Sequence, residues 1–148
     1  MKVLIIKTLT IITLTIVFFL ATTKNRNDNV NEIALNELNS YLVNQNEKAK
    51  YLGVVDYSLP SWKKRLTIIN LETGHRENYL VAHAINSGDI YANRFSNEIG
   101  SNKSSLGLFQ VGKTYTGIHG KSLRLHGLNK KSNSNAYTRA IVLHRVRL

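Results

Sequence analysis

The side chain with the clearest chemical capacity in this chain is that of His144, which ends a short apolar run. The run Arg139-Ala-Ile-Val-Leu-His144 is typical of a β-strand that delivers one polar side chain at its end. An imidazole titrates near neutral pH, so it can accept a proton from a nucleophile and return it to a leaving group. His144 is therefore a candidate for proton-transfer chemistry. A strand histidine whose ring is satisfied by packing is the alternative interpretation.

The other reactive residue types in the chain exclude several kinds of catalytic site. The chain has no cysteine, which excludes disulfides, thiolate metal sites and a thiol nucleophile within these residues. Its five histidines form no H-x-x-x-H pair and have no convergent carboxylate, so we expect neither a metal site nor a cofactor. Ser61-Trp-Lys-Lys64 fits the S-x-x-K motif of serine acyl-enzymes. It precedes a predicted strand, whereas that chemistry needs the serine at the start of a helix.

Short predicted strands make up most of the elements that must position these residues. Apolar runs bounded by turn residues predict strands at 52–57, 65–71, 78–84, 105–111, 122–125 and 140–143. The second and third of these strands form a hairpin. A separate helical turn is predicted at 133–140. One helix precedes them. It is capped by Asp28 or Asn29 and continues to about Lys50, with an apolar stripe at Val30, Ala34, Leu38 and Leu42. We therefore expect an α+β fold that is mainly β, with one N-terminal amphipathic helix.

The first residues of the chain are typical of an export signal. Lys2 and Lys7 precede the uncharged run Thr8–Ala21, which is shorter than the roughly 20 residues that span a bilayer. We predict a signal peptide or membrane anchor in residues 1–22, with any anchoring through residues 3–21, and then a linker and helix in residues 23–50. This places the protein in the cell envelope or periplasm. A buried helix is the alternative for the apolar run.

A series of short motifs extends from Val55 to His144. They are Asp56-Tyr-Ser-x-Pro-Ser61, Lys64-Arg-Leu66, Val81-Ala-His83, Ser87-Gly88, Phe95-Ser-Asn97, Gly100-Ser101, Ser104-Ser-Leu-Gly-Leu-Phe109, Tyr115-Thr-Gly-Ile-His-Gly120, Ser122-Leu-Arg-Leu125, Gly127-Leu128, Asn135-Ala136 and Arg139-Ala-Ile-Val142. No motif is specific alone, but in this order and spacing they resemble the catalytic domain of murein L,D-transpeptidases. Two positions depart from the family pattern. Ala84 and Arg145 stand where glycine usually follows Val-Ala-His and the catalytic histidine.

The resemblance implies both a fold and a reaction. Residues 51–148 would form an incomplete L,D-transpeptidase-like β-sheet or sandwich. In the family, a cysteine thiolate attacks an amide of a peptidoglycan stem peptide, a histidine accepts the thiol proton, and backbone N–H groups stabilise the oxyanion. By resemblance, His144 takes the role of the base. The substrate-binding residues that the resemblance implies are Ser105, Tyr115, His119 and Gly120, although His119 fits a plain turn position equally well.

The family nucleophile lies beyond the histidine, in a Ser-x-Gly-Cys segment that this sequence does not contain. We therefore expect residues 51–148 to be a domain truncated before that segment, and inactive in transpeptidation as the chain stands. Turnover by the purified chain would contradict this expectation. Peptidoglycan stem peptides are the expected partners, and a non-catalytic, exported peptidoglycan-binding protein is the alternative.

The charge of the chain is strongly positive and unevenly distributed. The net charge is +11, and no acidic residue follows Glu98. A basic half indicates a polyanionic partner such as an acidic envelope polymer, while a solvated lysine-rich surface is the alternative. A basic nucleic-acid-binding protein is a further rival. Trp62 and the phenylalanines do not alternate with the basic residues as a base-stacking surface would, so we expect no nucleic acid as partner.

Overall fold

Strands dominate the structure, as the sequence predicts. The computed structural model of the chain describes residues 4–8, 14–19, 26–45 and 48–144. Its elements are β1 (Leu4–Thr8), β2 (Leu14–Phe19), α1 (Arg26–Gln45), β3 (Tyr51–Asp56), β4 (Leu66–Asn70), β5 (Arg76–Tyr79), the 3-10 turn η1 (Ile85–Ser87), β6 (Gly107–Gly117), β7 (Gly120–Gly127) and β8 (Val142–His144). The expected α+β, mainly β class with one N-terminal helix is therefore confirmed.

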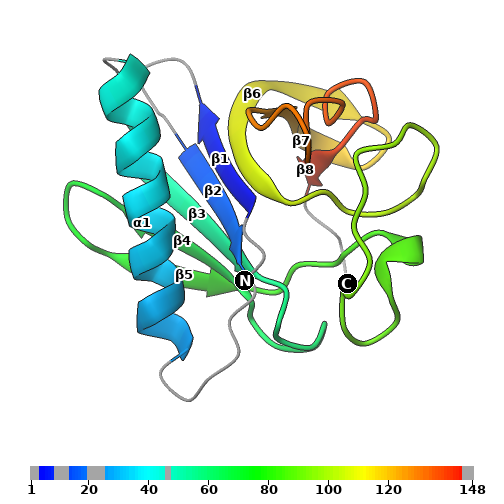
Figure 1. Ribbon diagram of the computed structural model, residues 1–148, viewed down its shortest axis with the longest axis horizontal. Coiled ribbons are helices and arrows are strands. Elements are labelled where there is room, and N and C mark those ends of the chain that lie inside the picture. The colour runs from blue at the N-terminus through cyan, green and yellow to red at the C-terminus, as the bar shows by residue number, and fades with distance from the viewer. Residues whose placement is uncertain (1–3, 9–13, 20–25, 46–47, 145–148) are drawn as a thin grey trace.

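The strands form one sheet with the order β5-β4-β3-β1-β6-β7-β8, in which β2 pairs with β3 and β6. Two antiparallel units lie at its ends, β5-β4-β3 and β6-β7-β8. Both β1 and β2 pair with β3 and with β6, so they join the two units. In Figure 1, α1 covers one face of the first unit, and β6 to β8 curve away beside it. This arrangement is that of a partial β-sandwich with one helix.

The interior strand β3 separates two apolar clusters because successive side chains of a strand point to opposite faces. Leu52 and Val54 point towards α1, where they pack with Ala34 and Leu38. On the opposite face, Val55 packs with a second cluster that also contains Tyr57, Leu66, Phe109, Val111, Leu125 and Ala136. This second cluster therefore joins residues of β3 and β4 to residues of β6 and β7.

The helical stripe is confirmed for the positions whose side chains are described. Ala34 and Leu38 are fully buried and Leu42 packs beside them, whereas the side chain of Val30 lies outside the described residues. The helix itself ends at Gln45 and not near Lys50, as the sequence predicts.

Most of the predicted strands are found, but several differ from the prediction in extent. The sequence predicts a strand over 78–84, and β5 instead spans Arg76–Tyr79. The chain leaves the hairpin after Tyr79 because the backbone and ring of the next residues satisfy a buried arginine. The carbonyl oxygen of Val81 accepts a hydrogen bond from Arg65, and His83 contacts the same guanidinium. By contrast, β6 and β7 are longer than predicted, with 11 and 8 residues.

The segment with the predicted export signal contributes β1 and β2 to the sheet, which pair with β3 and β6. No helix in the described part of the chain is long and apolar enough to cross a membrane. Residues 1–3, 9–13 and 20–22 of that segment lie outside the described residues, and its role in export stays a prediction.

Candidate functional site

A cavity of about 550 Å³ lies where the loop after β5, the loop 99–105 and the segment 138–144 meet. Its lining combines apolar side chains with a few polar ones from distant parts of the sequence. The polar members that matter here are Tyr57, His83, Ser104, Arg139 and His144. A mainly apolar concavity with a few convergent polar groups is the usual form of a small-ligand site.

Arg65 lies behind the cavity lining and bonds to two of the lining residues, Val81 and His83. Its side chain is only 2 % exposed. Nε donates to the carbonyl oxygen of Val81 at 2.9 Å, Nη1 to that of Leu59 at 3.1 Å, and Nη2 lies 2.8 Å from Nδ1 of His83. Burial lowers the pKa of Arg65, and the nearby Tyr57 and Asp56 side chains counteract that effect. A buried charge is tolerated here because its donors find acceptors.

The contact with Arg65 fixes the tautomer of His83. A guanidinium can only donate hydrogen bonds, so Nδ1 of His83 accepts and the ring proton is assigned to Nε2. Nε2 lies 3.1 Å from the carbonyl oxygen of Gly88, to which it donates. Gly88 has φ 149°, and a β-carbon at this position would lie 2.0 Å from the carbonyl oxygen of Tyr91. The ring of His83 is thus held at both nitrogens and serves as a fixed part of the wall.

Tyr57 is a buried residue of the same cavity lining, and its phenol is uncharged. Burial is the main cause that raises the pKa of Tyr57 far above its ordinary value, although a hydrogen bond with Ser104 and the charge of Arg65 oppose the rise. Ser104 in turn accepts a hydrogen bond from the backbone N–H of Ala84 at 3.0 Å, and its own N–H donates to Ser87 at 2.7 Å. These bonds connect the loop after β5 to the loop before β6.

Arg139 ties the loop 95–105 to the turns that precede β8. Nη1 donates to the carbonyl oxygen of Ser96 and to Oγ of Ser105. Nη2 donates to Oγ of Ser101 at 3.0 Å and to the carbonyl oxygen of Lys103 at 2.5 Å. The hydrogen bonds of Arg139 therefore hold the loop that lines the cavity. Desolvation lowers the pKa of Arg139.

The proposed base lies at the rim of this cavity, at the end of β8. His144 is exposed, and its ring stacks on that of His119 with centroids 4.4 Å apart and an interplanar angle of 15°. His119 comes from the turn between β6 and β7, and Gly120 at that turn has φ 81°. The long β6–β7 hairpin thus brings the Tyr115–Gly120 motif to the histidine strand.

The structure brings together some of the predicted substrate-binding residues and separates others. Ser105 lines the cavity with His144, but its hydroxyl is 2.8 Å from the carbonyl oxygen of Ser96 and also accepts from Arg139. Tyr115, His119 and Gly120 lie on the hairpin, outside the cavity lining, although the His119 ring stacks on His144. Tyr115 contacts Arg124 instead, with 5.3 Å from the ring centroid to Cζ.

Sequence reasoning missed the two arginines that shape the site. Arg65 and Arg139 appear in the sequence as ordinary basic residues of two motifs, with no local sign that either is used internally. Their partners lie 16 to 18 and 34 to 43 residues away for the Arg65–Val81/His83 and Arg139–Ser105/Ser96 contacts. Burial of a charge with distant acceptors is a tertiary property. Within the described residues, no group of three or more His, Asp or Glu side chains could hold a metal ion.

Comparison with protein families gives a match that covers all of the chain outside the predicted export segment. The model of the L,D-transpeptidase catalytic domain matches residues 22–148. Comparison with curated proteins and with solved structures gives no significant match.

Proposed function

Because the chain belongs to the L,D-transpeptidase catalytic-domain family, we propose that it acts on peptidoglycan stem peptides, with His144 as the general base. The observation that carries this proposal is the position of His144 at the rim of the cavity, stacked on His119. The cavity then receives the peptide. We propose His119 and Gly120, at the tip of the β6–β7 hairpin, and Tyr115, further along β6, as substrate-binding residues outside the cavity lining.

The reaction of the family needs a thiolate that attacks the amide, with the histidine taking the thiol proton. Residues 1–148 contain no cysteine. We therefore propose that this polypeptide binds the peptide and presents the base, and does not form an acyl-enzyme by itself. Removing the nucleophile from a catalytic unit costs on the order of a millionfold in rate, so turnover is below detection.

Two assays of the purified chain test this function separately. Co-sedimentation with purified peptidoglycan sacculi measures binding, and we expect retention of the chain. Incubation with a stem tetrapeptide, followed by mass spectrometry, measures acyl transfer, and we expect no adduct and no cross-linked product. Failure to sediment with sacculi would contradict the substrate class. Formation of an acyl adduct would contradict the assignment of a thiol-dependent reaction.

A second candidate function is a non-catalytic binder located in the cell envelope, which the family match and the absence of cysteine both favour. The two differ in what His144 does. A binder that makes no use of the base tolerates His144→Gln without change in affinity. In a substrate-presenting site, the same change alters contacts to the peptide, since the ring lies at the cavity rim. A titration of both proteins with the tetrapeptide separates the two functions.

A further inference from the structure

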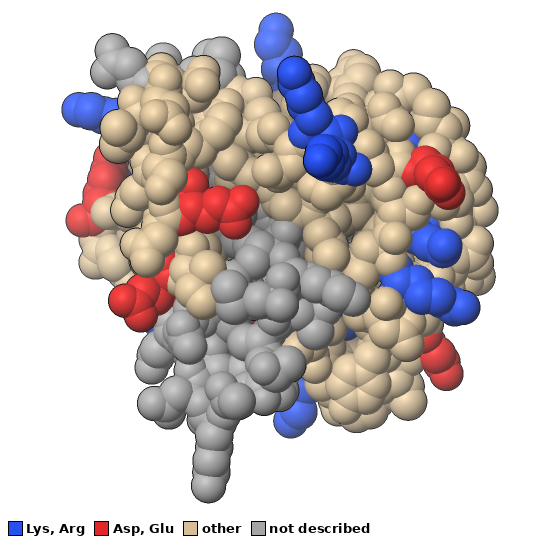
Figure 2. Space-filling model, in the orientation of Figure 1, with Lys and Arg blue, Asp and Glu red and all other residues tan. Residues whose placement is uncertain are grey.

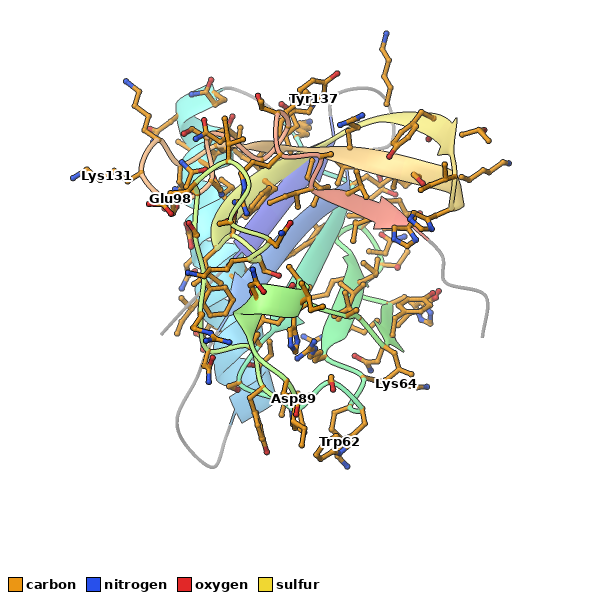
Figure 3. All side chains as sticks on the ribbon, turned by 90° about the vertical axis from the view of Figure 1, so that its right-hand side faces the viewer. Trp62, Lys64, Asp89, Glu98, Lys131 and Tyr137 are labelled. Carbon is orange, nitrogen blue, oxygen red and sulfur yellow. The ribbon has the colours of Figure 1, made fainter. Side chains whose placement is uncertain are left out.

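Arg124 of β7 contacts two tyrosine rings that come from different elements. Its Cζ lies 5.3 Å from the ring centroid of Tyr115 on β6 and 5.3 Å from that of Tyr137 in the turns before β8. Both distances are within the range of cation–π attraction. Tyr137 also stacks on His126, with centroids 4.6 Å apart. In Figure 3, Tyr137 lies beside β7, at the end of the molecule opposite Trp62. The guanidinium is therefore held in place before any ligand arrives.

Most of the hydrogen-bonding capacity of Arg124 is not used by the residues that the structure describes. A guanidinium has five N–H donors, and the one acceptor given for Arg124 in the described residues is the carbonyl oxygen of Tyr137, at 3.4 Å from Nη1. That distance is long for an N–H···O bond. The contrast with Arg65 and Arg139 is clear, because each of those donates at several shorter distances. Arg124 is only partly buried, so its remaining donors can reach an outside ligand.

Among the residues that the structure describes, no carboxylate is paired with Arg124. No acidic residue follows Glu98 in the sequence, and the ion pairs found among the described residues lie elsewhere, at Lys50–Glu72 and His75–Glu77. Figure 2 shows acidic side chains mainly on the helix side of the view, and scattered basic and acidic side chains on the other side. An anion that binds here meets a positive potential with no competing carboxylate from its own strands.

Arg124 lies outside the cavity lining, and the strand register places it next to His144 at the cavity rim, so a peptide in the cavity reaches Arg124 by passing His144. Tyr115 is opposite Ser122, and Ser122 is opposite His144, while Arg124 is opposite Val142. Side chains two apart on a strand share a face, so the side chains of Arg124 and His144 are on the same face of the β6–β7–β8 unit. They are diagonal neighbours, which corresponds to about 7–8 Å between such positions.

We propose that Arg124, held by Tyr115 and Tyr137, is a binding subsite for a carboxylate of the peptide ligand. The planar fork of a guanidinium matches a carboxylate through two parallel hydrogen bonds. A guanidinium that is already held by ring contacts loses less conformational freedom on binding. Since one extended residue spans about 3.3–3.6 Å, a C-terminal carboxylate at Arg124 sets an amide within about two residues of the His144 ring. The nature of the peptide rests on the proposed function; the carboxylate preference rests on the geometry of Arg124.

The test compares a stem tetrapeptide that has a free C-terminal carboxylate with the same peptide as its C-terminal amide. Dissociation constants for the 148-residue chain are measured by calorimetry at low salt. We expect the acid to bind roughly tenfold more tightly than the amide. Arg124→Gln removes this preference, and Arg124→Lys removes most of it because an ammonium has no fork. Lys121→Gln, which removes the same charge from an exposed position on β7, is the matched control and keeps the preference. Melting curves verify that all variants fold.

The outcomes separate this subsite from the proposed function. Equal binding of acid and amide by the wild type, no binding of either peptide, or a preference that persists in Arg124→Gln would each overturn the subsite. If sacculi are still bound in those cases, the proposed substrate class stands without the subsite. A further test lets inorganic phosphate and acetate compete with the acid peptide, at concentrations that supply the same anionic charge. Equal competition by the two anions would also overturn the subsite, because the site would then select anions by charge and not by the shape of a carboxylate.

Discussion

The contact between Arg65 and His83 leads to a prediction whose size follows from the two bonds of one ring. His83→Leu removes the acceptor at 2.8 Å from Nη2 of Arg65 and the donor at 3.1 Å from the carbonyl oxygen of Gly88. A hydrogen bond to a charged group contributes about 1.5–3 kcal/mol and a neutral one about 0.5–1.5 kcal/mol. We expect His83→Leu to lower the free energy of unfolding by about 2–4 kcal/mol, because it leaves a buried guanidinium without one of its acceptors.

His83→Asn is the matched variant, since its Oδ1 can stand where Nδ1 stands and still accept from Arg65. It loses only the bond to Gly88, so we expect a loss of about 0.5–1.5 kcal/mol. His75→Leu, at an exposed position on the other side of the hairpin turn, is the control for a histidine removed from the surface, with an expected change within about 0.5 kcal/mol.

Urea unfolding followed by circular dichroism measures all three variants against the wild type, with thermal melting as a second readout. A loss of 1 kcal/mol corresponds to roughly 2–4 °C in a domain of this size. The reasoning is refuted if His83→Asn loses as much stability as His83→Leu, because the acceptor for Arg65 would then not be the source of the effect. It is also refuted if His83→Leu stays within about 0.5 kcal/mol of the wild type.

Three further predictions follow from other buried groups. Asn133 is fully buried, its Nδ2 donates to the carbonyl oxygen of Leu108 at 2.9 Å and its Oδ1 accepts from the N–H of Asn129 at 2.8 Å. Asn133→Ala should therefore cost about 2–3 kcal/mol, and Asn133→Asp should cost more because a carboxylate oxygen would face that carbonyl; urea unfolding measures both, and equal stability of the two variants would contradict the assignment. Arg139→Gln should lower stability by about 1.5–3 kcal/mol and speed hydrogen exchange in the loop 96–105, whereas unchanged exchange there would show that Arg139 does not hold the loop. Desolvation raises the pKa of Glu37 above its ordinary 4.5, so the folded state favours the protonated acid; its contribution is present below pH 4.5 and lost as pH rises through the higher folded value. Glu37→Gln should therefore stabilise the protein at pH 7 by less than about 1 kcal/mol, after allowance for solvent screening, and leave stability unchanged at pH 3.5; a gain of the same size at both pH values would contradict the sign.

Local patterns were sufficient for the elements that carry the apolar core. The stripe of Ala34 and Leu38 predicts a helix that packs on a sheet, and both side chains are fully buried. The alternating and continuous apolar runs predict β3 and β4 within one residue of their observed ends. These elements depend on a repeat of two or of 3.6 residues, which the sequence displays directly.

The candidate site was only partly predictable. The order of the motifs indicated the family and singled out His144, His119 and Ser105. The cavity, and the contact of His119 with His144 at 4.4 Å between ring centroids, required the structure. The predicted strand 78–84 was wrong. The local pattern favours a strand there, but the carbonyl oxygen of Val81 accepts a hydrogen bond from the buried Arg65, a contact that the local pattern does not reveal.

The sequence by itself determined the helix and the strands that carry the apolar core, the residues that can take part in proton transfer, and the absence of a thiol in residues 1–148. Only the tertiary structure decided which cations serve the fold and which remain available. Arg65 and Arg139 donate to groups far away in the sequence, whereas Arg124 retains donors that no described residue accepts at short distance. The physical reason is that three arginines have the same side chain and differ only in the acceptors that folding brings within about 3 Å of it.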